Sequence, residues 1–414
     1  MLIFLALIIL ALAMFGHASL LIGWVNRIHS TGLRRWLVKS LSLPLLPLVP
    51  LAPLLLLTWN DLTSSLRILL SDTPTSSSLS LESLAELSFW TTTFGPTPLR
   101  SIAVLYVLFC AVVAIPILGF TVYHRRRKRL PKCVVYSRHI DCDTVAAIGH
   151  VPAAGRLAQW VTAIPGNQIF RLRLEERHIR CPRLSTELDG LSIVQITDLH
   201  MTGRVTPDYF HQVVRQANAW QPDIIAITGD LVDEAECTEP LLEIFAGLRA
   251  PHGIYFVLGN HDFRCGDLPR FRQQLEQAGL IDLGGKCHHL SIKNCDILLA
   301  GNELPWLPPA ADMSALPARP DQLRVLLSHS PDQFRWAQQH RFDLMLAGHT
   351  HGGQICFPLI GPTLCPSWYG TRYAEGDFAA GGTYMHVSRG VSGELPLRWN
   401  CPPELSKIVL RAGS

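Results

Sequence analysis

Residues 191–200 read Leu-Ser-Ile-Val-Gln-Ile-Thr-Asp-Leu-His, a short apolar run that ends in an acidic residue and a histidine. A run this short and this rich in β-forming residues favours a buried strand over residues 191–197. Asp198 and His200 then lie just beyond the carboxyl end of that strand. We therefore expect a strand that delivers two metal-binding side chains to one edge of a sheet.

Four further runs of the same kind follow along the chain, and each leads into residues that can bind a metal. They are residues 223–228 before Asp230, 253–258 before Asn260 and His261, 323–328 before His329, and 342–347 before His349 and His351. Helices are expected between the first strands, one capped by Thr206 with Pro207 at its first position and another over residues 268–278. Alternating strands and helices indicate an α/β domain whose site forms at the carboxyl ends of the strands.

The candidate ligands carry oxygen and imidazole donors and no thiolate: Asp198, His200, Asp230, Asn260, His329, His349 and His351. This donor set suits Mn, Fe, Zn or Ni and differs from a cysteine-rich structural zinc site. So many ligands exceed the needs of one tetrahedral ion, whereas two divalent ions about 3.5–4 Å apart that share one carboxylate would use them all. Such a pair would clamp phosphoryl oxygens and make hydroxide available near neutral pH as an in-line nucleophile.

In this order, the motifs Asp-x-His, Gly-Asp, Gly-Asn-His-Asp, a lone His and Gly-His-x-His resemble those of the calcineurin-like metallophosphoesterase superfamily. The resemblance extends to its membrane-associated bacterial branch of YkuE- and YaeI-type phosphodiesterases and covers about residues 169–410. Residues 387–390, 396–399 and 401–404 resemble the C-terminal signature of that branch. The loop 391–393 departs from the branch, in which a glycine-richer loop is expected.

The resemblance implies a four-layer sandwich of two mixed β-sheets flanked by helices, an α/β (α+β) fold. It also implies that Asp198, His200 and His351 hold one ion, that Asn260, His329 and His349 hold the other, and that Asp230 bridges the two. By the same resemblance, His261 would contact the phosphate and protonate the leaving oxygen, so His261 and Asp230 are the expected catalytic residues. Arg389 ends a predicted strand near the site, where phosphate contact and a salt bridge are the two alternatives.

The first third of the chain is hydrophobic. Apolar segments at about residues 1–25 and 99–123 have the length needed to cross a bilayer, and Pro116 in the second is tolerated in membrane helices. Residues 41–59 are also apolar but carry prolines at every third position from Pro44 to Pro53, which favours polyproline geometry or a broken helix. A cleaved signal peptide is the alternative for the first segment, but no Lys or Arg precedes its long apolar run.

Charge predicts the membrane topology. Basic residues are concentrated in the loop at 27–39 and in the run at 125–129. The Ser/Thr-rich loop between these two basic segments is acidic. Three crossings place both basic segments in the cytoplasm, and two crossings do not. We therefore expect a multi-pass protein of the inner (plasma) membrane, with a transmembrane region at 1–130, a connecting region at 131–168 that is either flexible or packed on the domain, and a cytoplasmic catalytic domain at 169–414.

Net charge and cysteine pattern bear on the expected partners and on the state of the thiols. The formal net charge is only +3, and basic residues are not interleaved with aromatics, so no nucleic-acid partner is expected. The eleven cysteines show no CxxC pairing, which favours reduced thiols.

The leading hypothesis is a hydrolase of phosphodiester or pyrophosphate bonds, with a lipid-linked substrate suggested by the membrane segments. The alternatives are a phosphodiesterase of soluble substrates that is merely localised at the membrane, and a non-catalytic binding module. A binding module would be expected to lack a ligand or His261, and none of these residues is missing.

Overall fold

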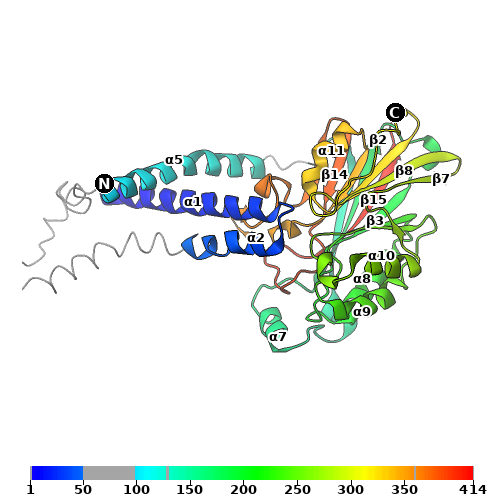
Figure 1. The fold of residues 1–414 in the computed structure, drawn as a ribbon, viewed down its shortest axis with the longest axis horizontal. Coiled ribbons are helices and arrows are strands. Elements are labelled where there is room, and N and C mark those ends of the chain that lie inside the picture. The colour runs from blue at the N-terminus through cyan, green and yellow to red at the C-terminus, as the bar shows by residue number, and fades with distance from the viewer. Residues whose placement is uncertain (1, 50–97, 127–129, 359, 414) are drawn as a thin grey trace, which may run out of the picture. The chain divides into compact units, whose positions relative to one another are not determined.

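The computed structural model describes residues 2–49, 98–126, 130–358 and 360–413. The chain divides into two compact units (Figure 1). The first unit consists of Met1–Ile28 and Arg35–Lys128, and the second of His29–Arg34 and Arg129–Ser414.

The first unit contains helices α1 (Leu2–His29), α2 (Arg35–Ser42) and α5 (Pro98–Arg126). By length and composition, the stretches Ile8–His29 and Leu105–Val122 are apolar enough to cross a membrane, a test that a buried core helix or a signal sequence also passes. Helix α5 continues through Pro116. Of the expected segment 41–59, residues 50–59 lie outside the described residues.

Helices α1 and α5 pack through small side chains. Ala13 of α1 is buried in one cluster with Cys110 and Ala111 of α5. A Cβ atom added at Gly16 would collide with the backbone oxygen of Cys110, so glycine is needed for this close approach. Small residues at a helix crossing are typical of helices that associate in lipid.

The second unit contains two large sheets. The first has the strand order β1-β2-β15-β3-β4-β5-β6. Its strands are β1 (Val134–Asp143), β2 (Arg171–Cys181), β3 (Ser192–Ile196), β4 (Ile224–Thr228), β5 (Ile254–Val257), β6 (Ile281–Asp282) and β15 (Glu404–Ala412). Strands β3 to β6 are parallel, whereas β15 is antiparallel to β3 and parallel to β2, so the sheet is mixed.

The second sheet has the strand order β13-β14-β10-β9-β8-β7. Its strands are β7 (Cys287–Ile292), β8 (Cys295–Asn302), β9 (Leu323–Ser328), β10 (Leu344–Ala347), β13 (Gly376–Ala380) and β14 (Thr383–Val387). The four central strands are parallel and the two edge strands run antiparallel to their neighbours. Both large sheets are therefore mixed, as expected.

The sheets face each other across a buried apolar layer. Side chains alternate along a strand, so Ile193 of β3 enters the layer between the sheets while Val194 and Ile196 face the helices. Buried Gln195 also bridges the sheets, because its Nε2 donates to the backbone oxygen of Ala347 on β10 at 2.9 Å. This apolar layer packs the two sheets against each other and so positions the edges at which the candidate ligands lie.

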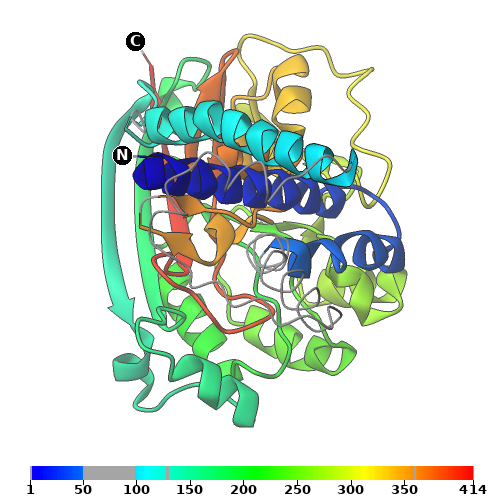
Figure 2. The same ribbon diagram turned by 90° about the vertical axis from the view of Figure 1, so that its left-hand side faces the viewer.

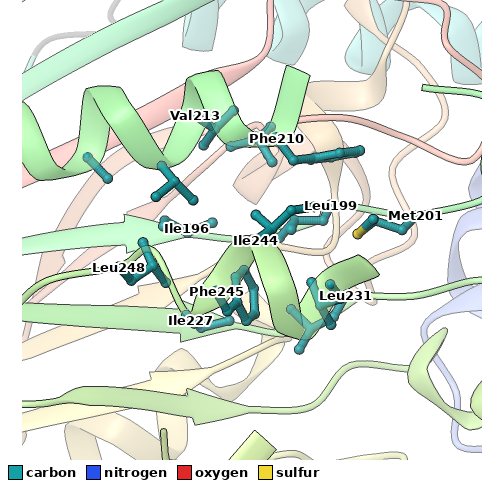
Figure 3. Close-up of a cluster of buried hydrophobic side chains, with 14 of the residues drawn as sticks. Ile196, Leu199, Met201, Phe210, Val213, Ile227, Leu231, Ile244, Phe245 and Leu248 are labelled. Carbon is teal, nitrogen blue, oxygen red and sulfur yellow. The ribbon is translucent and has the colours of Figure 1, made fainter. Parts of the chain in front are cut away.

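Helices cover both outer faces. Helices α8 (Pro207–Ala219), α9 (Thr238–Phe245) and α10 (Leu268–Gln277) lie on the first sheet, and α11 (Phe334–Gln339) lies on the second (Figure 1). Figure 3 shows how Phe210 and Val213 of α8 and Ile244 and Phe245 of α9 pack against the strands. The order helix, sheet, sheet, helix confirms the expected four-layer sandwich. Thr206 is the N-cap residue of α8, although its side chain makes no capping hydrogen bond.

Part of the expected connecting region 131–168 belongs to the first sheet. Strand β1 pairs with β2 in antiparallel fashion along its length and forms the edge of the sheet (Figure 2). Two short helices follow, α6 (Thr144–Ile148) and α7 (Arg156–Thr162). Of the two alternatives that the sequence left open for this region, the structure therefore shows a packed one.

Candidate metal centre

The expected ligands all follow the carboxyl ends of parallel strands. Asp198 and His200 follow β3, Asp230 follows β4, Asn260 follows β5, His329 follows β9, and His349 and His351 follow β10. Strands β3 to β5 belong to the first sheet, and β9 and β10 to the second. The site therefore lies at the carboxyl ends of the parallel strands of both sheets, and both sheets contribute side chains to it.

One group of ligands is formed by Asp198, His200, Asp230 and His351, whose donor atoms all lie within 4.8 Å of one another. Nε2 of His200 lies 3.4 Å from Oδ2 of Asp230 and 2.9 Å from Nε2 of His351. Nε2 of His351 lies 3.3 Å from Oδ1 of Asp198. Two imidazole nitrogens and two carboxylates that converge in this way fit a divalent cation.

A second group consists of Asp230, His329 and His349, again with donor atoms within 4.8 Å of one another. Nε2 of His329 lies 3.1 Å from Oδ2 of Asp230, and the rings of His329 and His349 are 4.9 Å apart between centroids. Asp230 belongs to both groups. A carboxylate that two groups share is the arrangement expected of a bridging ligand.

Unsatisfied polar atoms mark the second group. Nε2 of His329, Nε2 of His349 and Oδ1 of Asn260 are buried and have no hydrogen-bond partner in the described structure. Buried polar atoms are nearly always paired, so three unpaired atoms on the expected ligands require an explanation. A cation that accepts all three lone pairs supplies one, and the residues present therefore fit a divalent metal.

The ligands sit on a strained backbone. Five of them have positive φ angles, which residues other than glycine rarely adopt: Asp198 (55°), His200 (46°), Asp230 (54°), His349 (72°) and His351 (52°). Such conformations cost about 1–3 kcal/mol each and persist only where the surrounding structure enforces them. Strain concentrated on these residues indicates a functional constraint at this edge of the sheets.

The chain between ligands has no room for larger residues. At Gly259, an added Cβ would collide with Oδ1 of Asp230 and lie 2.8 Å from Nε2 of His329. At Gly348, it would collide with Oδ2 of Asp198. Glycine is therefore required at both positions for the ligands to approach each other.

Comparison with known proteins agrees with this geometry. Residues 191–353 match the family model described as calcineurin-like phosphoesterase, a range that begins at β3 and ends just after His351. The metallophosphoesterase YkuE of Bacillus subtilis is 31% identical over 255 residues, which cover 57% of this chain and 85% of YkuE. The chain belongs to the calcineurin-like phosphoesterase family. It is therefore a metal-dependent phosphoester hydrolase by family.

Two further relatives have more specific names. Phosphodiesterase YaeI of Escherichia coli is 29% identical over 226 residues, which cover 53% of this chain and 81% of YaeI. The UDP-2,3-diacylglucosamine pyrophosphatase LpxG of Chlamydia muridarum is 26% identical over 301 residues, which cover 59% of this chain and 90% of LpxG. All three relatives match over more than half of this chain.

Electrostatics prepares the imidazoles of this calcineurin-like phosphoesterase for metal binding. Burial, together with the charges of neighbouring histidines, lowers the pKa of His349 and His351 well below the usual range. Both are therefore neutral near pH 7, which is the form that binds a metal. Burial would also lower the pKa of His200, but the hydrogen bond with Asp233 and the neighbouring carboxylates raise it to about 9.

His261 lies at the rim of the calcineurin-like site. Its ring packs edge-on against His200 with centroids 4.5 Å apart, and its backbone N–H donates to Oδ1 of Asp230 at 2.7 Å. About 20% of its side chain is exposed, whereas the side chain of His200 is 2% exposed. The structure thus brings His261 to the ligands but leaves it accessible to a substrate.

Asp233 is a residue of the site that the sequence motifs did not predict. Its Oδ1 lies 2.5 Å from Nδ1 of His261, and its Oδ2 lies 2.9 Å from Nδ1 of His200. Arg264 neutralises the same carboxylate at 2.7 Å. Because a carboxylate only accepts hydrogen bonds, it fixes Nδ1 of each ring as the donor and turns Nε2 toward the site. The spacing Gly-Asp-x-x-Asp at 229–233 is the signal that would have found it.

Asp262 is the second missed residue. It is fully buried, and its two oxygens accept from the backbone N–H groups of Asp230, Leu231, Val232 and Gly259 at 2.7–3.2 Å. These bonds tie the loop after β4 to the loop after β5. Asp262 therefore holds Asp230 in place without facing the ligands itself.

Arg389 takes the salt-bridge alternative in the structure. It is buried, with Nε 2.7 Å from Oε2 of Glu404 and Nη2 2.8 Å from Oε1 of Glu175. Both partners lie on neighbouring strands of the first sheet. The guanidinium of Arg389 is therefore held by two carboxylates within the sheet.

Two other side chains touch the ligands from outside. Nη1 of buried Arg398 donates to the backbone oxygen of His351 at 2.9 Å, and its Nη2 lies 3.2 Å from Nδ1 of the same residue. The ring of Trp306 lies 4.6 Å from that of His349 and 5.7 Å from that of His329. Neither residue follows a predicted strand motif, although Arg398 belongs to the segment 396–399 that resembles the C-terminal signature of the branch.

Proposed function

We propose that this protein is a membrane-anchored, two-metal phosphoesterase that cleaves a phosphodiester or pyrophosphate bond of a lipid-linked substrate. The observation that carries the proposal is the sharing of Asp230 between two ligand groups, one of which presents the buried, unpaired Nε2 atoms of His329 and His349. Seven candidate ligands, the shared carboxylate included, are more than one ion needs. Asp198, His200 and His351 are the proposed ligands of one ion and Asn260, His329 and His349 those of the other, with Asp230 bridging them.

The ions themselves are expected to be Mn, Fe, Zn or Ni, which the oxygen and imidazole donors suit. When bound, two such ions neutralise the phosphoryl oxygens and supply hydroxide near neutral pH. The remaining chemistry belongs to the side chains of this chain.

His261 is the proposed proton donor. Its Nδ1 proton is engaged by Asp233, so Nε2 faces the substrate side of the site. From there it would contact the phosphate and hand a proton to the leaving oxygen. General acid catalysis of this kind contributes about 10²–10⁴-fold in rate. Asp233 acts through His261 and is a positioning residue.

Two observations support a lipid-linked substrate. The chain contains two helices that are long and apolar enough to cross a membrane, and its relative LpxG is named for a diacylated nucleotide sugar, whose pyrophosphate it cleaves. YaeI, in contrast, is named only as a phosphodiesterase. A substrate dissolved in water, with the anchor serving only to localise the enzyme, is therefore the competing outcome of the assay below.

We also propose that the protein is a multi-pass protein of the plasma membrane with its catalytic domain in the cytoplasm. The basic residues near Arg34 and those at 125–129 support this orientation. Reporter fusions after Ser40, which follows the first basic loop, and after the C-terminus should both report a cytoplasmic location. A periplasmic or extracellular C-terminus would contradict the proposed orientation.

The test of the activity uses the full chain in detergent with Mn added. Wild type is assayed against detergent-dispersed lipid phosphodiesters and pyrophosphates and against a soluble nitrophenyl diester. Turnover of the lipid substrates alone supports the proposal, whereas turnover of the soluble diester alone favours the competing outcome. Asp230→Asn and His261→Ala should each lose at least about 10²-fold in kcat, whereas the exposed His289→Ala control should not. Metal-dependent hydrolysis that survives both changes would overturn the site assignment.

A further inference from the structure

Helix α7 turns its large apolar side chains to the outside of the second unit. Leu157 and Trp160 lie one helical turn apart and are 57% and 83% exposed, and Ile164, just beyond the helix, is exposed as well. The residue that α7 buries is the small Ala158. Figures 1 and 2 show α7 protruding from the layers of the sandwich. The helix is therefore attached through a small residue and offers its large ones to the surroundings.

Helix α8 of the same unit has the opposite and usual arrangement. It buries Tyr209, Phe210 and Val213, and it exposes the charged Asp208 and Arg215. Around α7, in contrast, residues 157–170 contain no charged side chain. Packing within the unit does not explain an outward apolar face without charges, and faces of this kind mark sites of interaction.

Side-chain hydrogen bonds fix α7 in this position. Nδ2 of Asn167 donates to the backbone oxygen of Val161, at the end of the helix, and to that of Pro396, both at 2.9 Å. Oδ1 of the same residue accepts from the backbone N–H of Arg398 at 3.0 Å. The outward face is therefore part of an ordered structure.

The exposed apolar surface continues beyond α7. A Cβ atom added at Gly166 would lie 3.0 Å from Nε1 of the exposed Trp399. The ring of Trp399 lies 6.3 Å from that of Phe357, which is also exposed and ends strand β11 (Cys356–Phe357). We call this set of side chains the α7 surface: Leu157, Trp160, Ile164, Phe357 and Trp399.

The α7 surface adjoins the metal centre. Trp399 directly follows Arg398, whose Nη1 donates to the backbone oxygen of His351 at 2.9 Å. The backbone N–H of Trp399 donates to the backbone oxygen of Gln354 at 3.0 Å, only three residues after His351. A partner bound to the α7 surface therefore lies on the His351 side of the site.

The residue types of the α7 surface fit the headgroup region of a lipid bilayer. An indole ring has an apolar body and one polar N–H, and tryptophan is enriched at membrane–water interfaces for this reason. A bilayer is also the apolar partner at the highest effective concentration, since the chain contains two helices long and apolar enough to cross one. A lipid surface therefore fits better than a soluble partner.

We propose that the α7 surface docks the second unit on the bilayer in which the chain is anchored, with Trp160 at the level of the headgroups. This inference rests on the proposed membrane anchoring and extends it, because an anchor alone leaves the orientation of the catalytic domain open. Docking through the α7 surface turns the His351 side of the metal centre toward the headgroups. It thereby favours a phosphoester of the headgroup layer as the substrate.

The first experiment measures whether Trp160 contacts lipid. The full chain is reconstituted into phosphatidylcholine vesicles with or without bromine on the acyl chains, since bromine quenches tryptophan emission on contact. The emission of Trp160 is obtained as the difference between wild type and Trp160→Phe. We expect bromine to reduce it at least about twofold, because the apolar face of an interfacial helix reaches about 5–10 Å into the boundary between headgroups and acyl chains.

Trp220 provides the control. It ends α8 and precedes the amino end of β4, so it lies at the edge of the sheet opposite to the ligands. Its emission, obtained with Trp220→Phe, should not respond to bromine. Protein that does not float with the vesicles would contradict the proposed anchoring. Protein that floats while Trp160 and Trp220 respond alike would overturn the docking, as it would if a second copy or the first unit covered the α7 surface.

The second experiment places a charge on one side or the other of α7. Leu157→Glu puts a carboxylate into the α7 surface, whereas Gln159→Glu puts the same group about 200° around the helix. Both positions are exposed, so both variants should fold. Leu157→Glu should reduce the quenching of Trp160 to that of Trp220, because a carboxylate must lose water to enter the boundary. Gln159→Glu should keep the quenching of wild type, and equal quenching in the two variants would overturn the inference.

Discussion

Nδ1 of His261 lies 2.5 Å from Oδ1 of Asp233, and the other oxygen of that carboxylate lies 2.9 Å from Nδ1 of His200. One buried carboxylate thus orients both a proposed metal ligand and the proposed proton donor. A change at Asp233 is therefore expected to affect both metal binding and proton donation.

Asp233→Asn is the corresponding prediction. The amide presents an N–H to one of the two imidazoles, which must then change tautomer or rotate away. Loss of such a supporting contact typically costs about 10–100-fold in metal affinity or activity. We expect kcat to fall in this range with little change in the unfolding temperature of the metal-loaded protein. Asp312→Asn, at an exposed position, is the control and should match wild type.

Asp262→Asn should lower stability instead. Its carboxylate accepts four backbone N–H groups, and an amide can accept only with its single oxygen while its N–H₂ faces buried donors. Leaving such donors unsatisfied costs about 1–3 kcal/mol. Thermal unfolding of the metal-free protein should shift to lower temperature. An unfolding curve that coincides with wild type would show that these bonds are not needed to hold the loop.

Gly348→Ala tests the approach of the ligands. The added methyl group would collide with Oδ2 of Asp198 and Oγ1 of Thr197, so Asp198 must move although no ligand has been removed. We expect less bound metal per chain than in wild type, by elemental analysis, with Gly119→Ala unaffected. Full metal content in Gly348→Ala would mean that Asp198 is free to move without loss of the ion.

The pH dependence of stability should report on His386, which is buried away from the ligands. Burial alone would lower its pKa, but Asp377 at 2.8 Å and Glu404 at 2.9 Å face its two nitrogens and raise the pKa to about 10. A pKa that folding raises from 6.5 stabilises the fold fully below pH 6.5, and this contribution disappears as the pH rises through about 10. The unfolding temperature should therefore fall over this interval.

His386→Gln provides the comparison for that pH scan. It has no imidazole to deprotonate, so its unfolding temperature should be lower than that of wild type near pH 6.5 and should approach it toward pH 10. His289→Gln should run parallel to wild type throughout. A constant difference between His386→Gln and wild type would contradict the assigned protonation.

The sequence was sufficient for the strands, their ligands and the layered fold, because each ligand directly follows an apolar run whose character is local. Residues that act through partners distant in the chain were harder to place. Arg389 meets Glu175, and Trp306 meets Thr31, only after the sheet and its loops have formed. The sequence does not predict strand β1 for the same reason, since its exposed side chains give no clear strand signal and its order comes from pairing with β2.

The most direct test of the central claim is the number of metal ions bound per chain. Elemental analysis of the full chain purified with Mn should give two ions for wild type and about one for His349→Ala, which removes a ligand of only one group. One ion or none in wild type, or two ions retained in His349→Ala, would contradict a two-metal centre built on Asp230.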